Sequence, residues 1–286
     1  MKKIKVVVTG AQGQLGKSIR DLADHYPEYQ FTFLSRSDMP IHHFELVREF
    51  LEGIRPDVVI NAAAYTAVDR AEQERDLAFQ VNGEAVGVLA AWCAKHGTKF
   101  MHISTDYVFD GNAETPYVET DATNPQSVYG ASKLDGEQQA MHYCPDSIII
   151  RTSWVYAPHG KNFVRTMIGL LKEKDVIRVV NDQIGAPTYA LDLAQAILDI
   201  IRSNKWTPGI YHFSNAGRIS WYDFAVEIQR RIGSRCRIEP ISTSEYPTAA
   251  KRPHFSLLST KKIGLNYGIQ PRFWEDALSD CLNKLT

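Results

Sequence analysis

Cysteine is scarce in this sequence, and its few cysteines are widely spaced. The four residues are Cys93, Cys144, Cys236 and Cys281, with no CxxC pair and no neighbouring histidine pattern of the kind that builds a zinc site. A chain of 286 residues buries a sizeable core without disulfides or a structural metal. We therefore expect buried free thiols in a reducing, cytoplasmic location, and no bound metal.

Long apolar runs and an excess of one charge are also missing. Basic residues at the N-terminus precede only three consecutive valines, short of the ~7 to 15 apolar residues of a signal peptide. No run reaches the ~18 apolar residues that a membrane-spanning helix needs. Lys and Arg number 32 against 33 Asp and Glu, so no global basic field attracts nucleic acid or anionic lipid. We expect neither nucleic acid nor a membrane as a partner, and a homodimer is left open.

What the sequence does contain is a regular alternation of element types in its first half. Short β-branched runs bounded by turn residues alternate with longer amphipathic segments, a pattern typical of a parallel sheet with helical crossovers. The predicted strands span 4–9, 31–35, 58–63, 99–104 and 147–151. The predicted helices between them span 14–26, 44–54, 67–96 and 127–143. We predict an α/β fold with a Rossmann-type doubly wound parallel sheet.

The second half is less regular. Its predicted helices span 161–173, 190–202, 220–232 and 272–285, separated by turn-rich or extended segments. We predict a dinucleotide-binding domain over residues 1–152 and a smaller, irregular α/β domain, mainly substrate-binding, over residues 153–286. Strand-like segments at 176–180 and 210–214 are expected to rejoin the main sheet, so that about 176–214 returns to the first domain.

Three glycines follow the first strand and open the first helix. Gly10, Gly13 and Gly16 stand in the sequence TGAQGQLG. Glycine lets the backbone turn tightly and approach a pyrophosphate, while free amides at the helix N-terminus supply donors. A plain tight turn is the alternative. The continuing βαβ pattern favours a dinucleotide site.

The end of the second strand indicates which dinucleotide is bound. An acidic residue about 20 positions beyond the glycines favours NAD, whereas an arginine favours NADP. Here the segment reads Ser35-Arg36-Ser37-Asp38, and Arg36 can pair with a 2'-phosphate. We predict NADPH as cofactor, with NADH also accepted because Ser35 carries no charge. Alternatively, Arg36 is a solvated surface charge and Asp38 accepts from a ribose hydroxyl.

A tyrosine and a lysine lie four residues apart in Tyr129-Gly-Ala-Ser-Lys133. On a helix both side chains share one face. A cation beside a phenol lowers its pKa from about 10 towards neutrality, which would make Tyr129 a proton donor at cellular pH. Thr105, at the end of the fourth strand, would hydrogen-bond the carbonyl being reduced. Alone, such a pair is usually an exposed helix face, but the glycine turn and Thr105 favour catalysis.

Ligands of open α/β sheets collect beyond the strand ends, where Val68 and Trp154 lie in sequence. An indole can cover an apolar face of a ligand, while Thr105 and Asp106 address a polar edge. Alternatively, Trp154 is a core residue of the domain junction.

With these residues together, the sequence resembles the extended short-chain dehydrogenase/reductase family over essentially its whole length. Five blocks carry the closer likeness to nucleotide-sugar reductases of that family, namely NAAAYTAVDRAE (61–72), STDYVFDG (104–111), RTSWVY (151–156), NF (162–163) and DQIGAPT (182–188). The resemblance implies reduction of the C4 keto group of dTDP-6-deoxy-L-lyxo-4-hexulose to dTDP-β-L-rhamnose, a precursor of bacterial surface polysaccharide. Related dehydratases carry Thr-Asp-Glu where this chain has Thr105-Asp106-Tyr107, so simple reduction is favoured.

The resemblance also implies a set of site residues. The catalytic residues are Thr105, Tyr129 and Lys133. The cofactor-binding residues are Gly10, Gln12, Gly13, Gln14, Leu15, Gly16, Ser35, Arg36, Ala62, Ala63, Ala64, Tyr65, Tyr129 and Lys133. The substrate-binding residues are Val68, Thr105, Asp106, Tyr107, Trp154, Asn162, Gln183 and Arg252. Among them, Trp154 is expected to cover the apolar face of the deoxysugar, the nucleotide base is expected near 183–188, and the diphosphate near Lys161 or Arg252.

Some features depart from the family pattern. Met39-Pro40-Ile41 replaces an acidic residue before the second helix, and the stretches where some relatives bind magnesium contain no glutamate. Two other functions stay open from the sequence. One is reduction of another nucleotide-linked 4-ketosugar, and the other is a non-catalytic, NADP-binding regulatory subunit of the methionine adenosyltransferase type. A pure binding module has no need of Thr105, Tyr129 and Lys133 together, which favours an enzyme.

Overall fold

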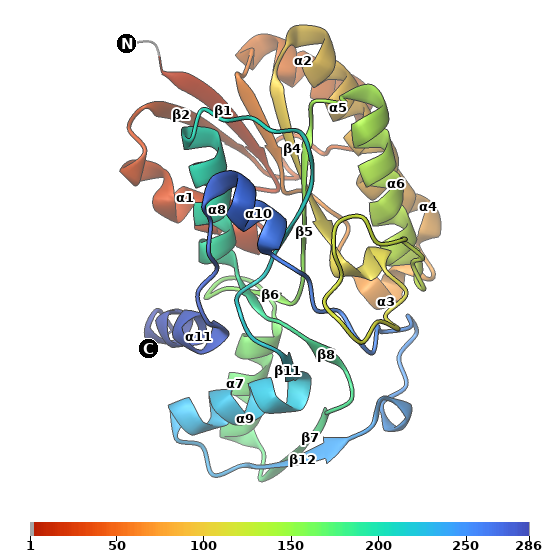
Figure 1. Cartoon of the computed structure of the whole chain (residues 1–286), viewed down its shortest axis with the longest axis vertical. Coiled ribbons are helices and arrows are strands. Elements are labelled where there is room, and N and C mark those ends of the chain that lie inside the picture. Colours follow the sequence, from red (N-terminus) through yellow and green to blue (C-terminus); the bar gives the residue numbers. More distant parts are fainter. Residues whose placement is uncertain (1–2, 286) are drawn as a thin grey trace.

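A six-stranded parallel sheet forms the centre of the larger part of the molecule (Figure 1). The computed structural model describes residues 3–285. The strands of this sheet are β1 (Ile4–Thr9), β2 (Tyr29–Leu34), β3 (Val58–Asn61), β4 (Lys99–Thr105), β5 (Ile148–Thr152) and β10 (Gly209–Phe213). They lie in the order β10-β5-β4-β3-β1-β2, and every neighbouring pair is parallel. The predicted doubly wound sheet is confirmed, and its order reverses at β1, the position where such sheets bind ligands.

Helices cover both faces of this sheet (Figure 1). One face carries α1 (Gln14–Leu22), α8 (Ala190–Arg202) and α10 (Lys261–Tyr267), and the other carries α2 (Phe44–Ile54), α5 (Ala85–His96) and α6 (Val128–Tyr143). Val6 and Val8 belong to the core beneath α1 and α8, whereas Val7 between them belongs to the core beneath α2 and α5. Successive side chains of a strand point to opposite faces. Burial of both faces therefore explains the unbroken β-branched runs.

The helix predicted over 67–96 is interrupted in the structure. It consists of α3 (Val68–Ala71), α4 (Arg75–Phe79), a π-helical turn (Gln80–Glu84) and α5. In the π-helical turn, Asn82 is buried, accepts from the Tyr65 backbone N–H at 2.8 Å and donates to Ser132 Oγ at 3.0 Å. These bonds tie the turn to the loop after β3 and to α6, a use typical of π turns near functional sites.

One helical stretch among residues 3–285, Arg75–His96, is long and apolar enough by composition to cross a membrane. The sequence showed no unbroken apolar run there because polar residues of the π-helical turn interrupt it. Val86, Leu89 and Trp92 of this stretch are buried in the core under α2 and α6. Their burial is that of a core helix in a folded domain.

A smaller unit lies beyond the carboxyl ends of the central strands (Figure 1). Its helices are α7 (Phe163–Glu173), α9 (Trp221–Ile232) and α11 (Trp274–Asn283). Its short strands pair as β6 (Val155–Tyr156) with β9 (Thr188–Tyr189), β7 (Val176–Val180) with β12 (Arg237–Ile241), and β8 (Ile184–Gly185) with β11 (Ile219–Ser220). A second core around Phe224, Tyr156 and Trp274 holds these elements together.

The chain crosses between the two units more than once. The segment predicted at 210–214 joins the main sheet as β10 beside β5, and α8 packs on α1. The segment at 176–180 does not rejoin the sheet, because β7 pairs in parallel with β12. The prediction was therefore wrong for this strand, whose exposed Val176 and Arg178 show that one face stays outside a core. The division into two binding domains stays a prediction.

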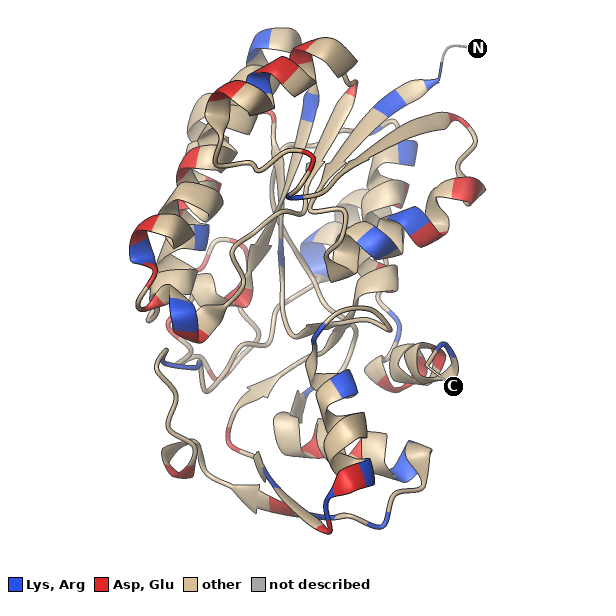
Figure 2. Cartoon of the chain, turned by 180° about the vertical axis from the view of Figure 1, so that it is seen from behind, with Lys and Arg blue, Asp and Glu red and all other residues tan. Residues whose placement is uncertain are grey.

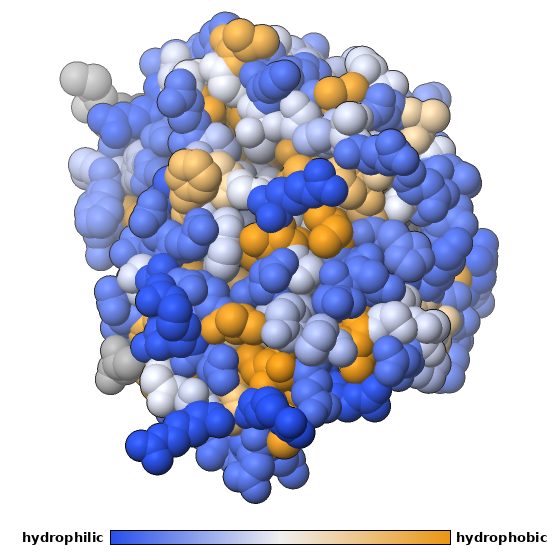
Figure 3. Space-filling model, turned by 60° about the horizontal axis from the view of Figure 1, so that its bottom comes forward, coloured by the Kyte–Doolittle hydropathy of each residue, from blue (hydrophilic) through white to orange (hydrophobic). Residues whose placement is uncertain are grey.

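The surface carries both signs of charge. Figure 2 shows Lys and Arg interspersed with Asp and Glu along the outer helices, in keeping with the net charge of −1. On the lower face, apolar side chains gather towards the middle and hydrophilic ones surround them (Figure 3). Within residues 3–285, the four cysteines are buried free thiols and no group of three or more His, Cys, Asp or Glu side chains is placed to hold a metal.

Candidate active site

A cavity of about 720 Å³ opens at the carboxyl ends of the central strands, between the two units. Its size is that of small-molecule and cofactor sites, which are mostly a few hundred to about 1,000 Å³. Its wall is built mainly from segments that directly follow β1, β2, β3, β4 and β5, together with one face of α6. Residues far apart in sequence therefore converge on one hollow.

The glycine turn between β1 and α1 forms one end of this cavity. Gly10 has φ +69°, and a Cβ there would lie 2.6 Å from the Ala62 carbonyl oxygen. A Cβ at Gly16 would lie 2.4 Å from the Gly10 carbonyl oxygen. The N-cap residue of α1 is Gly13, which has no side chain to cap the helix, so the first amides of α1 stay open to a ligand. This cradle fits a dinucleotide pyrophosphate.

The end of β2 forms the neighbouring wall. Arg36 lines the cavity together with Met39, Ile41 and His42. Ser35 lies outside the lining, because its backbone N–H and hydroxyl donate to the Asp38 carboxylate at 2.9 Å and 2.6 Å. Asp38 is therefore engaged in a local turn, whereas Arg36 is exposed and its guanidinium forms no ion pair within residues 3–285.

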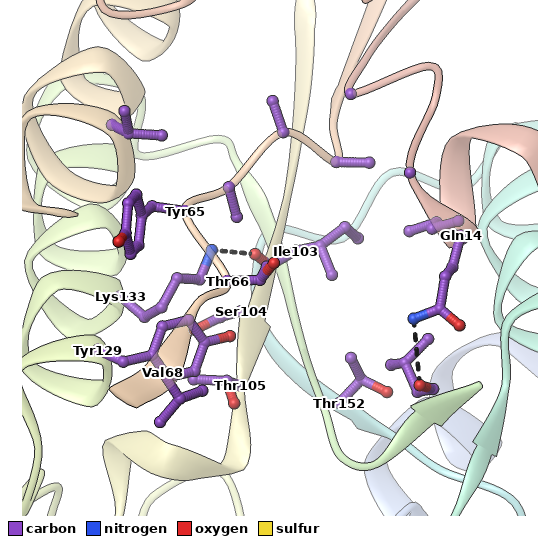
Figure 4. Close-up of a pocket in the computed structure, with 18 of the residues that line it drawn as sticks. Gln14, Tyr65, Thr66, Val68, Ile103, Ser104, Thr105, Tyr129, Lys133 and Thr152 are labelled. Atoms are coloured by element: carbon purple, nitrogen blue, oxygen red, sulfur yellow. Dashed lines mark hydrogen bonds between the residues drawn. The ribbon is translucent and has the colours of Figure 1, made fainter. Parts of the chain in front are cut away.

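Tyr129 and Lys133 project from the first two turns of α6 into the cavity (Figure 4). The Ser127 hydroxyl caps this helix by accepting from the Gly130 N–H at 3.1 Å. A Cβ at Gly130 would lie 2.2 Å from the Tyr107 carbonyl oxygen, so the helix start can sit directly against the end of β4. The Tyr129 hydroxyl shares a hydrogen bond with Thr105 there.

The expected lowering of the tyrosine pKa is not seen. Burial raises the pKa of Tyr129 to about 12, the hydrogen bond with Thr105 opposes this only in part, and the negative charge of Asp106 adds to it. Lys133 does not act on the phenol here, because its Nζ donates to the Ile103 carbonyl oxygen at 2.5 Å (Figure 4). Desolvation thus outweighs the cation. A phenol with a high pKa remains protonated, which is the state that a proton donor requires.

Lys133 is itself almost fully buried, with 2% exposure. Burial lowers the pKa of Lys133 to about 8, and the carboxylate of Glu137, one turn further along α6, partly opposes this. Glu137 is already paired with Arg151 through hydrogen bonds of 2.9 Å and 2.6 Å. Because Arg151 already balances the charge of Glu137, this carboxylate stabilises the Lys133 ammonium less than an unpaired one would.

Asp106 is the one carboxylate of the cavity lining. Its Oδ1 accepts from Thr105 Oγ1 at 2.9 Å, while its Oδ2 is buried and has no hydrogen-bond partner among the described residues. Burial raises the pKa of Asp106 to about 6. A buried acceptor without a partner is costly, so it marks a place where a ligand hydroxyl can bind.

Trp154 lines the opposite wall, just beyond β5. Its backbone has φ +49°, a strained conformation for a bulky residue. Its ring stacks on Trp221 of α9 with centroids 3.6 Å apart and planes 11° apart. Both interpretations of Trp154 therefore apply in part: one side borders the cavity and the other packs on the smaller unit.

Most of the predicted site residues lie together. The residues that line the cavity are Gly10, Gln12, Gly13, Gln14, Leu15, Arg36, Ala62, Ala63, Ala64, Tyr65, Val68, Thr105, Asp106, Tyr107, Tyr129, Lys133 and Trp154. The predicted residues outside its lining are Gly16, Ser35, Asn162, Gln183 and Arg252.

Three of the outer residues make other contacts. Asn162 caps α7 and donates from Nδ2 to Gln14 Oε1 at 2.9 Å, which links the glycine turn to the smaller unit. Gln183 donates to Thr243 Oγ1 at 3.1 Å, and Arg252 pairs with Asp69 at 2.7 Å. Their roles in substrate binding stay predictions.

Some lining residues were not predicted from the sequence. Thr152 ends β5 directly beside Thr105 in the sheet register, so its strand-end position was an available signal. Leu77 and Val81 reach the cavity only because the helix over 67–96 is interrupted. His42 and Gly160 belong to none of the sequence motifs, and only the tertiary structure places them at the cavity.

A glycine cradle at the switch point of a parallel sheet, with a tyrosine and lysine on the helix facing it, defines an oxidoreductase of the extended short-chain dehydrogenase/reductase class. Within that class the chain belongs to the RmlD family, since the family model described as RmlD substrate binding domain matches residues 4–286.

Known proteins of similar sequence and structure agree with this assignment. The chain is 42% identical to a dTDP-4-dehydrorhamnose reductase of Aggregatibacter actinomycetemcomitans, over 96% of this chain and 97% of the relative. It is 43% identical to the spore coat polysaccharide biosynthesis protein SpsK of Bacillus subtilis, over 98% and 97%. A crystal structure of dTDP-4-dehydrorhamnose reductase from Bacillus anthracis in complex with NADP superposes with a TM-score of 0.94 at 39% identity, covering 99% of each chain.

Proposed function

We propose that the protein reduces the C4 keto group of dTDP-6-deoxy-L-lyxo-4-hexulose with NADPH, forming dTDP-β-L-rhamnose. The observation that carries this proposal is the protonated Tyr129 hydroxyl, held at Thr105 in the same cavity as the glycine cradle. The names of the relatives and the NADP complex of the Bacillus anthracis reductase support the substrate and the cofactor. Buried free thiols agree with a cytoplasmic location.

The cofactor, when bound, supplies the hydride that adds to C4 of the sugar. The chain's own residues provide the proton and the geometry. Tyr129 releases its phenolic proton to the sugar O4, so the C=O bond becomes an alcohol and the tyrosine is left as a phenolate. Thr105 orients the sugar oxygen through its hydroxyl, and Lys133 fixes the ribose side of the site.

Substrate orientation is assigned to the polar and apolar walls. The free Oδ2 of Asp106 accepts from a sugar hydroxyl, and the ring of Trp154 covers the apolar C6 methyl and sugar face. Lys161 lines the cavity next to Gly160, and we assign it to the diphosphate. Arg252 is engaged by Asp69, so its diphosphate contact requires that pair to open.

The test is turnover by the purified protein with NADPH and the 4-keto-6-deoxyhexulose generated in place. We expect stoichiometric loss of NADPH and formation of dTDP-β-L-rhamnose, identified by NMR. In the matched variant Tyr129→Phe, the ring stays and the proton is lost, so turnover should fall by roughly 10²-fold or more with an unchanged NADPH Kd. Full turnover by Tyr129→Phe, or no product from the wild type, would contradict the proposal.

A further inference from the structure

A series of buried polar side chains, each within hydrogen-bond distance of the next, leads from β1 to α6. Thr9 Oγ1 donates to Asn61 Oδ1 at 2.6 Å, Asn61 Nδ2 lies 3.0 Å from His102 Nδ1, and His102 Nε2 lies 3.3 Å from Lys133 Nζ. These four residues are at most 2% exposed. Thr9, Asn61 and His102 stand on three adjacent strands and lie outside the cavity lining. Lys133, at the α6 end of this series, is the member whose side chain lines the cavity.

The order of hydrogen bonds determines which nitrogen of His102 carries the proton. Thr9 Oγ1 accepts from the Ala63 backbone N–H at 3.2 Å, so its own proton goes to the Asn61 carbonyl oxygen. The Asn61 amide therefore turns its NH₂ group towards His102, and Nδ1 of the ring must accept. A neutral imidazole that accepts at Nδ1 carries its proton at Nε2. Burial and the neighbouring Lys133 hold the pKa of His102 well below its usual value, so the ring is neutral.

This position of the His102 proton affects the protonation of Lys133. The N–H at His102 Nε2 points at Lys133 Nζ and offers it no lone pair. An ammonium at Nζ thus has the Ile103 carbonyl oxygen as its acceptor and faces a second donor. An uncharged amine can accept the hydrogen bond from His102. This contact favours the amine over the ammonium, in the same direction as burial.

The other ionisable groups near Lys133 do not reverse this preference. They come from each element around it, namely Tyr129 and Glu137 on α6, Asp106 after β4, Tyr65 after β3 and Arg151 on β5. Glu137 favours the ammonium form of Lys133, but its carboxylate is already paired with Arg151. The Tyr65 hydroxyl donates a hydrogen bond to Glu74 at 2.6 Å. His102 is the group that contacts Nζ directly, beside the Ile103 carbonyl.

We propose that His102 is a positioning residue for the reductase reaction: held by Thr9 and Asn61, it orients the Lys133 side chain and makes its ammonium readily deprotonated. The inference rests on the proposed function for its catalytic meaning. The contact itself is testable without any substrate. Lys133 would then change charge near neutral pH and link cofactor binding to pH.

The decisive measurement is the NMR titration of Lys133 in the ligand-free protein carrying ¹³C-labelled lysine, with the signal assigned through Lys133→Arg. We expect Lys133 in the wild type to titrate with a pKa of about 8, and a titration at its ordinary value would overturn the proposal without any further variant. His102→Gln can turn an amide oxygen towards Nζ, and His102→Asn keeps an acceptor for Asn61 but withdraws the N–H from Nζ. Both variants should raise the Lys133 titration by about one pH unit, a tenfold change in proton affinity.

The matched control is His212→Gln. His212 is also fully buried, on β10 of the same sheet, and lies outside the cavity lining. This variant loses stability but should leave the Lys133 titration in place, so an equal shift there would overturn the proposal. The pH dependence of the NADPH Kd should move with the Lys133 titration in the His102 variants. If the ketosugar is not reduced but the titration shift is found, the proposed function fails and the inference about His102 stands.

Discussion

Asp106 combines a buried carboxylate with an oxygen that has no partner among residues 3–285. Its folded-state pKa is raised to about 6 from 3.8, so ionisation costs free energy in the folded protein. The stability present below about pH 4 is lost as the pH rises towards 6. Asp106→Asn removes that loss. We expect a gain of about 1 to 3 kcal/mol at pH 7 that vanishes near pH 4, with reduced turnover because a sugar contact is gone.

Denaturant unfolding at both pH values checks this prediction. Asp110→Asn is the control of opposite sign, since hydrogen bonds from Asn112 and Tyr117 lower the pKa of Asp110. That variant should be destabilised at pH 7. An equal effect of Asp106→Asn on the unfolding free energy at pH 4 and pH 7 would show that ionisation of Asp106 does not destabilise the folded protein.

Arg36 is the residue expected to choose between the two cofactors. It lines the cavity beside the end of β2, while the neighbouring Asp38 carboxylate is held in a local turn by hydrogen bonds from Ser35. A guanidinium paired with phosphate contributes roughly 1.5 to 3 kcal/mol. Arg36→Ala should therefore reduce kcat/KM for NADPH about tenfold or more and leave that for NADH nearly unchanged. An unchanged ratio of the two kcat/KM values would show that Arg36 is only a surface charge.

At the scale of elements, the closeness of β1 and α1 depends on Gly16. A Cβ there would meet the backbone of Gly10 and Ala11 at 2.4 Å and 2.7 Å, so Gly16→Ala must displace the turn. We expect a destabilisation of about 1 to 3 kcal/mol and a rise of at least tenfold in the NADPH Kd. Calorimetric binding and thermal melting measure both effects.

Gly53 provides the control for this change. It also lies in a helix, α2, but a Cβ there would meet nothing within 4 Å. Gly53→Ala should stabilise the protein by about 0.5 to 1 kcal/mol through helix propensity and leave cofactor binding unchanged. If Gly16→Ala behaves like Gly53→Ala, the close approach of backbone at Gly16 is not required.

For the whole molecule, the stack of Trp154 on Trp221 joins the cavity to the smaller unit. Trp154→Ala should leave the NADPH Kd unchanged and raise the KM for the ketosugar, because in the proposed function the indole covers the sugar. Its melting temperature should fall only modestly, since the loss of an aromatic pair costs about 0.5 to 1.5 kcal/mol beyond area burial. Trp221→Ala removes the support of the ring and should lower both stability and substrate affinity. A large loss of stability in Trp154→Ala with unchanged KM would assign Trp154 to the core alone.

The central sheet, most helices and the grouping of Gly10, Tyr129 and Lys133 around one cavity could be predicted from the sequence. Alternating β-branched runs, the glycine spacing and the Tyr129–Lys133 interval are local patterns, and local patterns report backbone preference and helix face directly. Of the family blocks, those at 61–72, 104–111 and 151–156 added residues such as Tyr65, Thr105 and Trp154, which line one cavity, whereas Asn162 and Gln183 of the other two blocks lie outside its lining.

Tertiary structure alone decided the rest, because it depends on which distant segments meet. The pairing of β7 with β12 and the π-helical turn follow from long-range packing, which no short periodicity encodes. The high pKa of Tyr129 arises from burial by other elements, against the local expectation from Lys133. The contact of His102 with Lys133 joins β4 to α6. The sequence around either residue gives no sign of this contact, because His102 and Lys133 become neighbours only when α6 packs on β4 in the folded protein.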